Sequence, residues 1–285
     1  MRTDRRAVRV PRWSASPSNP RPRALLSFDC EEFDLPTEFG RAMALDEQIA
    51  LGAAGVDRLL MLLSACGVTA TMFTTAALAR ARPSLVRRMV GAGHELASHA
   101  VSHSSFRAVD MRTSRNILED IGAAAVVGFR RPRLLPTPAR ELLEAGYLYD
   151  SSIHPTWIPG RYNGLRQPRS AHWEDGLVRV PLSVVPVIRW PVFWLAFKNL
   201  PLSVTQAAVQ RILAHDGYCA FCFHPWELLD LSALGVPRFI RRVDGDAMRD
   251  RLQRFLKWLG ARADIVTYRD FVATCAVGSP EGTIQ

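Results

Sequence analysis

The 285-residue sequence is short of several features that define protein classes. Lysine occurs only at Lys198 and Lys257, so arginine carries nearly all of the positive charge. The five cysteines have no regular spacing, which argues against a disulfide framework and favours a reducing compartment. No apolar run of secretory type follows the basic amino terminus. We therefore expect a cytoplasmic protein with no signal peptide and no transmembrane helix.

Evenly spread positive charge is also missing. Six of the nine net positive charges lie in residues 1–23, which hold seven arginines and one aspartate. A nucleic-acid-binding domain would spread its basic residues over the fold, so nucleic acid is not an expected partner. The mixture of arginine with Pro, Ser and Asn is typical of a disordered tail. We predict a basic tail at 1–22, one folded domain at 23–275 and a short C-terminal tail at 276–285.

The body of the chain has the composition of one large α/β domain. Hydrophobic residues make up 48% of the sequence, enough for a sizeable core. Short apolar runs alternate with helical patterns, which predicts parallel strands joined by crossover helices. The expected strands include 24–28, 69–74, 95–97, 126–129, 177–181, 218–223 and 264–267. The longest expected helices run from 46 to 65 and from 246 to 260.

Polar side chains follow several of these strands directly. Asp29, His99, Arg130 and His224 each stand at or just beyond the carboxyl end of a predicted strand. In barrels of parallel strands, active sites are built at that end. The sequence therefore predicts an enzyme whose site is assembled from distant segments.

Two histidines and a carboxylate cluster supply candidate metal ligands. His99 and His103 are four residues apart, a spacing that places both imidazoles on one face of a helical turn. Glu31 and Glu32 follow the first strand, and in an extended chain Asp29 and Glu31 share a face. Two histidines and one carboxylate form a typical zinc ligand set, and the second carboxylate is left to act as a base.

Four motifs follow one another along the chain: Ser27–Glu31, His99-x-x-x-His103, Arg130-Arg131-Pro132 and Phe223-His224-Pro225-Trp226-Glu227. In this order they resemble the polysaccharide deacetylase (NodB-homology) family of metal-dependent carbohydrate N-deacetylases. The resemblance covers residues 24–272 and identifies 23–275 as a catalytic domain of this type. It implies a distorted (β/α)7-type barrel of parallel strands with outer helices.

The resemblance also implies catalytic roles. Asp29 is similar to the family's general base, and Arg130 to the arginine that holds the base in a charge-assisted pair. His224 is similar to the histidine that protonates the departing amine. The candidates for a partner of His224 are Glu174, Asp175 and Glu227.

One divalent metal ion is the cofactor that the resemblance implies. Its ligands are expected to be Glu31, His99 and His103, with Zn²⁺ as the first choice and Co²⁺ or Mn²⁺ as alternatives. The opening motif reads Asp-Cys-Glu-Glu where the family commonly has adjacent aspartates, so Glu32 stays open as an alternative to Glu31.

The chain departs from the family pattern at two further positions. Ala100 stands where a Ser or Thr usually follows the first histidine, so a hydrogen bond around the metal ligands is expected to be missing. Arg133 stands where an aromatic residue often follows Arg-x-Pro. We predict that Arg133 and Trp226 contact the substrate, and that Arg133 provides a rim suited to an acidic group.

Residues 184–201 form an aromatic segment interrupted by three prolines. It is too short and too interrupted to span a bilayer. Two interpretations remain: an insertion buried against the barrel, or an interfacial segment whose Trp and Phe side chains enter a membrane surface. The second would place the protein at the inner membrane face, in contact with a lipid-linked saccharide.

The expected activity is hydrolysis of a carbon–nitrogen bond other than a peptide bond. The expected reaction removes an N-acetyl group from an amino sugar of a glycan or a lipid-linked saccharide precursor, as part of glycan biosynthesis. One alternative is hydrolysis of a formamide or a cyclic amide on the same scaffold. Another is a catalytically silent relative that binds saccharides.

Overall fold

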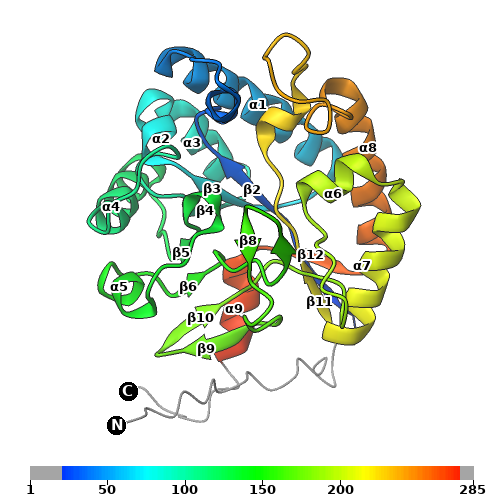
Figure 1. Ribbon diagram of the computed structural model, residues 1–285. Helices are drawn as coiled ribbons and strands as arrows, with labels where there is room; N and C mark the ends of the chain where they lie inside the picture. The colour runs from blue at the N-terminus through cyan, green and yellow to red at the C-terminus, as the bar shows by residue number, and fades with distance from the viewer. Residues whose placement is uncertain (1–20, 277–285) are drawn as a thin grey trace.

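The computed structural model describes residues 21–276 and shows strands at the centre of the molecule with helices around them (Figure 1). Most of the predicted tails, residues 1–20 and 277–285, lie outside the described residues. Arg21 and Pro22 were assigned to the tail but lie against the domain. The Arg21 guanidinium pairs with Asp264 at 3.1 Å, and the Asp264 N–H donates to the Pro22 carbonyl.

Seven strands form the main sheet, in the order β2-β3-β4-β5-β6-β10-β9. All neighbouring pairs are parallel except β10 and β9. The strands are β2 (Ser27–Cys30), β3 (Thr71–Thr74), β4 (Glu95–Ser98), β5 (Gly128–Phe129), β6 (Tyr149–Asp150), β10 (Leu177–Arg179) and β9 (His172–Glu174). The prediction of a parallel α/β fold is therefore confirmed.

A second parallel group continues this sheet. In it β1 (Arg23–Leu25) lies between β11 (Tyr218–Ala220) and β12 (Asp264–Val266). Only Leu26 separates β1 from β2. The segment after β11 runs parallel to β2, because Phe223 forms a parallel bridge with Phe28. Among the described residues no strand ladder joins β10 to β11, so the barrel is not closed. A hydrogen bond from the Ser183 N–H to the Ala220 carbonyl spans that gap.

Helices cover the outside of the strands (Figure 1). They are α1 (Leu45–Cys66), α2 (Ala76–Ala81), α3 (Pro83–Gly91), α4 (Asp110–Gly122), α5 (Ala139–Glu144), α6 (Trp194–Asn199), α7 (Leu202–Asp216), α8 (Gly245–Gly260) and α9 (Tyr268–Ala276). Three 3₁₀ turns and a two-stranded hairpin complete the described fold. They are η1 (Leu35–Phe39), η2 (Pro132–Leu134), η3 (Pro225–Leu228), and β7 (Trp157–Ile158) with β8 (Tyr162–Asn163).

Helix α1 is the one described helix that is long and apolar enough to cross a membrane, with a mean hydropathy of 1.6 over 18 residues. Half of that window is buried in the fold, as in the core helix of a globular protein. Its inner face belongs to the largest apolar cluster, which includes Phe28, Val56, Leu63, Phe221 and Phe255.

Two glycines bring α1 directly onto the backbone that carries the polar residues. A Cβ atom at Gly52 would lie 2.1 Å from the Glu31 carbonyl oxygen. A Cβ atom at Gly55 would lie 2.6 Å from the Pro225 carbonyl carbon. The helix therefore fixes the segments after β2 and β11 by backbone contact, which allows little adjustment.

We predict that Gly52→Ala destabilises the protein by about 1–3 kcal/mol, because the added methyl group must push α1 off a rigid backbone. Gly91→Ala is the matched control, since this helical glycine has no atom within 4 Å of the added Cβ. Urea unfolding of the two variants checks the prediction. Equal stability of Gly52→Ala and the wild type would show that the contact is not tight.

Candidate metal centre and active site

The predicted site residues converge at the carboxyl ends of the strands. Asp29 lies in β2 and Glu31 directly after it, while His99 follows β4 and Arg130 follows β5. His224 follows the bridge that extends β11. All five side chains are largely buried, as expected when parallel strands end at the same edge. Asp29, Glu31 and His224 line one cleft, and His99 and Arg130 lie next to Asp29.

Glu31, His99 and His103 meet at one point. Glu31 Oε2 lies 3.1 Å from His99 Nε2 and 3.4 Å from His103 Nε2. One ligand atom from each residue falls within 4.8 Å of the other two. Glu31 Oε2 is buried and has no hydrogen-bond partner in the described structure, so a cation among the three atoms would satisfy it. Two imidazole nitrogens and one carboxylate oxygen fit Zn²⁺.

Hydrogen bonds on the far nitrogens orient both imidazoles. His99 Nδ1 lies 2.8 Å from the Arg130 carbonyl, and His103 Nδ1 lies 2.7 Å from Asp34 Oδ1. With each Nδ1–H donating to these oxygens, each Nε2 lone pair faces Glu31. Asp34 was not predicted to belong to the site; its signal is its place at the end of the acidic cluster that begins at Asp29.

The local structure of the histidine pair differs from the prediction. The two residues are not on a helical turn: residues 99–109 form no helix, and Ala100 has a φ of +64°. The left-handed residue turns the chain so that the rings still approach, with centroids 5.8 Å apart. The helical geometry was wrong, although the pairing that it was used to predict is present. The Ala100 N–H donates to the Oγ atom of Ser98, two residues earlier in the chain, at 3.3 Å.

The structure separates the two glutamates after β2. Glu32 accepts a hydrogen bond from the Thr75 hydroxyl, and the His103 N–H donates to Glu32 Oε1 at 3.4 Å. The Glu32 carboxylate therefore holds the loop that contains His103 in place, whereas the Glu31 carboxylate faces the imidazole nitrogens. The geometry favours Glu31 as the ligand.

Arg130 holds Asp29 inside the barrel. Its Nη1 donates to Asp29 Oδ1 at 2.6 Å and to Ser27 Oγ at 2.9 Å. Burial would raise the pKa of Asp29, but Arg130, His99 and His224 together lower this pKa to about 2. The carboxylate is therefore charged at neutral pH and can accept a proton.

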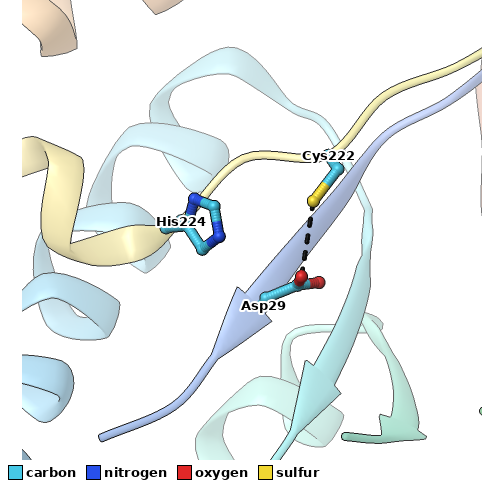
Figure 2. Close-up of side chains that lie close together, drawn as sticks. All are labelled: Asp29, Cys222 and His224. Atoms are coloured by element: carbon cyan, nitrogen blue, oxygen red, sulfur yellow. Dashed lines mark hydrogen bonds between the residues drawn. The ribbon is translucent and has the colours of Figure 1, made fainter. Parts of the chain in front are cut away.

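Cys222 also contacts this carboxylate, although it was not predicted as a site residue. Its thiol donates to Asp29 Oδ2 at 3.4 Å, and Figure 2 shows the sulfur directed at the carboxylate with His224 nearby. Burial and the charge of Asp29 raise the pKa of the thiol, so it stays a neutral donor. The sequence did contain a sign of this contact. Side chains alternate between the two faces of an extended segment, so those of residues 222 and 224 point to the same face.

Glu227 is the partner of His224. Its Oε1 accepts the His224 N–H at 2.8 Å and lies 3.3 Å from His224 Nδ1. Burial alone would lower the pKa of His224, but Glu227, Glu31 and Asp29 together raise it. Of the other candidates, Glu174 instead pairs with Arg179 at 2.9 Å, and Asp175 lies in the turn between β9 and β10.

A buried lysine compensates the charge of Glu227. Lys198 Nζ lies 3.5 Å from Glu227 Oε2, and both side chains are fully buried. Burial lowers the pKa of Lys198, although Glu227 opposes that shift. Lys198 comes from α6, so the aromatic segment 184–201 contributes to the site.

Aromatic rings enclose His224. Trp226 stacks on its imidazole with centroids 4.7 Å apart, and Trp194 meets it edge-on at 5.1 Å. Trp226 Nε1 also donates to Glu31 Oε1 at 3.3 Å. Trp226, predicted to contact substrate, is therefore a nearly buried wall of the cleft.

Arg133, the other predicted substrate contact, lies at the mouth of the cleft. Its side chain is 46% exposed and pairs with Asp34 at 3.6 Å and with Glu38 at 3.4 Å. Its φ of +60° is strained for a residue with a side chain. Arg161 also pairs with Glu38, so charged side chains lie at the entrance.

Comparisons with known proteins agree with these motifs. Residues 41–141 match the family model described as polysaccharide deacetylase. A segment of 53 residues is 45% identical to the chitooligosaccharide deacetylase of Sinorhizobium fredii. That match covers 18% of this chain and about a quarter of the curated relative's length. The resemblance to the polysaccharide deacetylase family is confirmed.

Several solved structures share this fold. A Mycobacterium smegmatis protein described as a polysaccharide deacetylase superposes with a TM-score of 0.62 at 19% identity, over 95% of this chain and 96% of that one. A Pseudomonas aeruginosa protein of the same description gives 0.60 at 17% identity, over 92% of each chain. The PuuE allantoinase gives 0.62 at 16% identity, over 91% of each chain. At these identities the likeness shows the fold alone.

We predict that Glu31→Ala abolishes stoichiometric binding of the metal that the deacetylase family requires, because one of its three ligands is lost. Glu32→Ala is the matched control and should keep one equivalent of metal, since Glu32 faces Thr75. Elemental analysis of the two dialysed variants tests this. The reverse pattern would assign the ligand role to Glu32.

Metal binding should also depend on pH through His103. Burial alone would lower the pKa of His103, but Glu31 and Asp34 raise it to about 9 in the metal-free protein. A metal ion must displace this proton, so its apparent affinity should rise about tenfold per pH unit and level off above about pH 9. Zinc titrations by calorimetry at several pH values measure both affinity and proton release. An affinity independent of pH over this range would contradict the assignment.

Proposed function

We propose that this chain is a metal-dependent hydrolase that removes an N-acetyl group from an amino sugar of a glycan or of its precursor. The proposal depends on three groups that lie together at one cleft. They are the Asp29 carboxylate paired with Arg130, the possible metal ligands Glu31, His99 and His103, and the His224 imidazole paired with Glu227. The family match and the identity with a chitooligosaccharide deacetylase support a carbohydrate amide as the substrate.

Glu31, His99 and His103 would hold the metal ion, and Zn²⁺ is the first choice for this ligand set. When bound, such an ion supplies Lewis-acid chemistry: it lowers the pKa of a coordinated water and polarises the amide carbonyl. His99 and His103 are already oriented for this task, because the Arg130 carbonyl and Asp34 fix their Nδ1 atoms.

Asp29 acts as the base and accepts the proton of the attacking water. Its pKa of about 2 keeps it ionised before the reaction, and its Oδ2 atom lies 3.9 Å from His99 Nε2, beside the metal cradle. Arg130 occupies the other oxygen and prevents the carboxylate from rotating away. The Cys222 thiol supports the reactive oxygen as a neutral donor.

His224 acts as the acid for the departing nitrogen. An amine leaves poorly as an anion, so the carbon–nitrogen bond breaks only when that nitrogen is protonated. The raised pKa of His224 keeps the imidazole protonated closer to neutral pH. Glu227 holds Nδ1, which leaves Nε2 to donate, and Trp226 and Trp194 limit rotation of the ring.

The alternatives have less support. The allantoinase likeness shows the fold and carries no argument for cyclic amide hydrolysis in this chain. A catalytically silent relative that only binds saccharides would not need Asp29 paired with Arg130, or His224 paired with Glu227. A reducing cytoplasm stays our proposal for the compartment, on the basis of the five free thiols in the described structure.

We predict that the zinc-loaded protein releases acetate from N-acetylated chitooligosaccharides and that a chelator stops it. Asp29→Asn should lower kcat by a factor of about 10³ or more while one equivalent of metal stays bound, because the base is lost and the ligands are kept. Acetate assays and elemental analysis test both points. Acetate release at the wild-type rate by Asp29→Asn would refute the base assignment. Formate release from an N-formyl amino sugar, or ring opening of a cyclic amide, with no acetate release from the oligosaccharide would select the alternative hydrolases.

A further inference from the structure

An exposed apolar patch lies on two neighbouring loops and has no role in the cleft chemistry. Val187 is 89% exposed and Ile188 is 71% exposed, on a turn closed by the bridge between Val184 and Pro191. Side chains of this kind are rarely presented together to water without a partner. We call this set the tryptophan patch; its members are Trp157, Leu165, Val187, Ile188 and Trp190.

Hydrogen bonds join the two loops into one surface. Arg189 Nη1 donates to the carbonyls of Pro155 and Gln167, at 3.2 and 2.9 Å. The Thr156 hydroxyl donates to the Arg189 carbonyl at 2.8 Å. The turn at 186–190 is therefore fastened to the segment that contains the β7–β8 hairpin.

Two residues of the turn have strained, left-handed backbone conformations. Val187 has a φ of +71° and Arg189 a φ of +53°. A left-handed conformation is unusual for any residue with a side chain and is most costly for a β-branched one such as Val187. Burial does not compensate this cost, because Val187 is almost fully exposed.

The structure divides the aromatic segment 184–201 into two parts. Phe193 and Phe197 are buried, and Trp194 packs against His224 and Trp226. The interpretation as a buried insertion therefore holds for the later residues, which pack on the barrel. The turn before them is exposed, and its entry into a membrane surface stays a proposal. Trp194 lines the cleft, so a substitution of Trp194 would not test binding to a membrane surface.

The two chain segments that carry the patch contain basic residues and no acidic ones. Residues 151–173 contain no Asp or Glu, and neither do residues 176–215. Exposed arginines in these segments are Arg161, which pairs with Glu38, and Arg166, which follows Leu165 of the patch. Tryptophan and aliphatic side chains within a basic surface match the interface of a bilayer with acidic headgroups, where apolar groups enter the acyl boundary and cations meet phosphate.

We propose that the tryptophan patch docks this protein onto an anionic phospholipid membrane. The β7–β8 hairpin that carries Trp157 also carries Arg161, which reaches Glu38 at the mouth of the cleft. Docking would bring the cleft entrance near the headgroups. The docking itself does not depend on the proposed chemistry; a lipid-linked amino sugar as substrate rests on both.

Co-sedimentation of the full chain with vesicles tests the docking. Vesicles of phosphatidylcholine with phosphatidylglycerol should bind the protein, and vesicles of phosphatidylcholine alone should bind it weakly. The double variant Ile188→Ser with Trp190→Ser should reduce the partition coefficient by about tenfold or more. Met61→Ser is the matched control and should bind as the wild type does, since Met61 is 72% exposed on α1 and away from the patch.

Three results would overturn the proposal. The first is no binding to any vesicle. The second is binding that the double variant leaves unchanged, which would assign it to the basic amino-terminal segment. The third is self-association of the chain that the double variant abolishes, which would make the patch an interface between copies. Acetate release from a soluble oligosaccharide should be the same in the double variant and the wild type, so failure of docking is distinguishable from failure of the proposed activity.

Discussion

The buried Arg130 guanidinium is the contact on which the geometry of the site depends. It is fully buried, packs over the Phe73 ring at 4.0 Å and donates to several elements. Its partners are Ser27, Asp29, Ser151 and Tyr268. An unpaired charge in this position would cost several kcal/mol, so the strands must keep the register that satisfies it. Because its own carbonyl accepts from His99, one residue orients both a carboxylate and an imidazole.

A second buried network forms the other side of the cleft. Glu227 joins the backbone and ring of His224 to Lys198, and two tryptophans close around the imidazole. One of the two lysines in the chain is used here, inside the protein. The segment that supplies Lys198 and Trp194 continues from the exposed turn of the tryptophan patch, so the wall of the cleft and the apolar surface belong to one insertion.

Much of the site could be predicted from residue order. Asp29, Arg130 and His224 follow strands of parallel type, and the ends of such strands meet, so their proximity needed no structure. The histidine pair was predicted for a wrong reason, because a left-handed Ala100 replaces the expected helical turn. Asp34 and Cys222 were missed, since an acidic loop residue and a strand cysteine usually have structural roles.

The sequence by itself determined the chemistry available: the candidate ligands, base and acid, and the parallel α/β order that brings them to one edge. The strand order and the candidate ligands follow from hydrophobic periodicity and from the types of residue at the strand ends, both of which are local properties. The acid and base roles are what the resemblance of the motifs to the deacetylase family implies. Only the tertiary structure decided that Glu31 and not Glu32 faces the imidazoles, that Glu227 and not Glu174 holds His224, and which part of 184–201 is exposed. These choices depend on the directions of side chains and on contacts between residues far apart in the sequence. Glu31 and Trp226, for example, are 195 positions apart, and no local pattern in the sequence indicates that they meet.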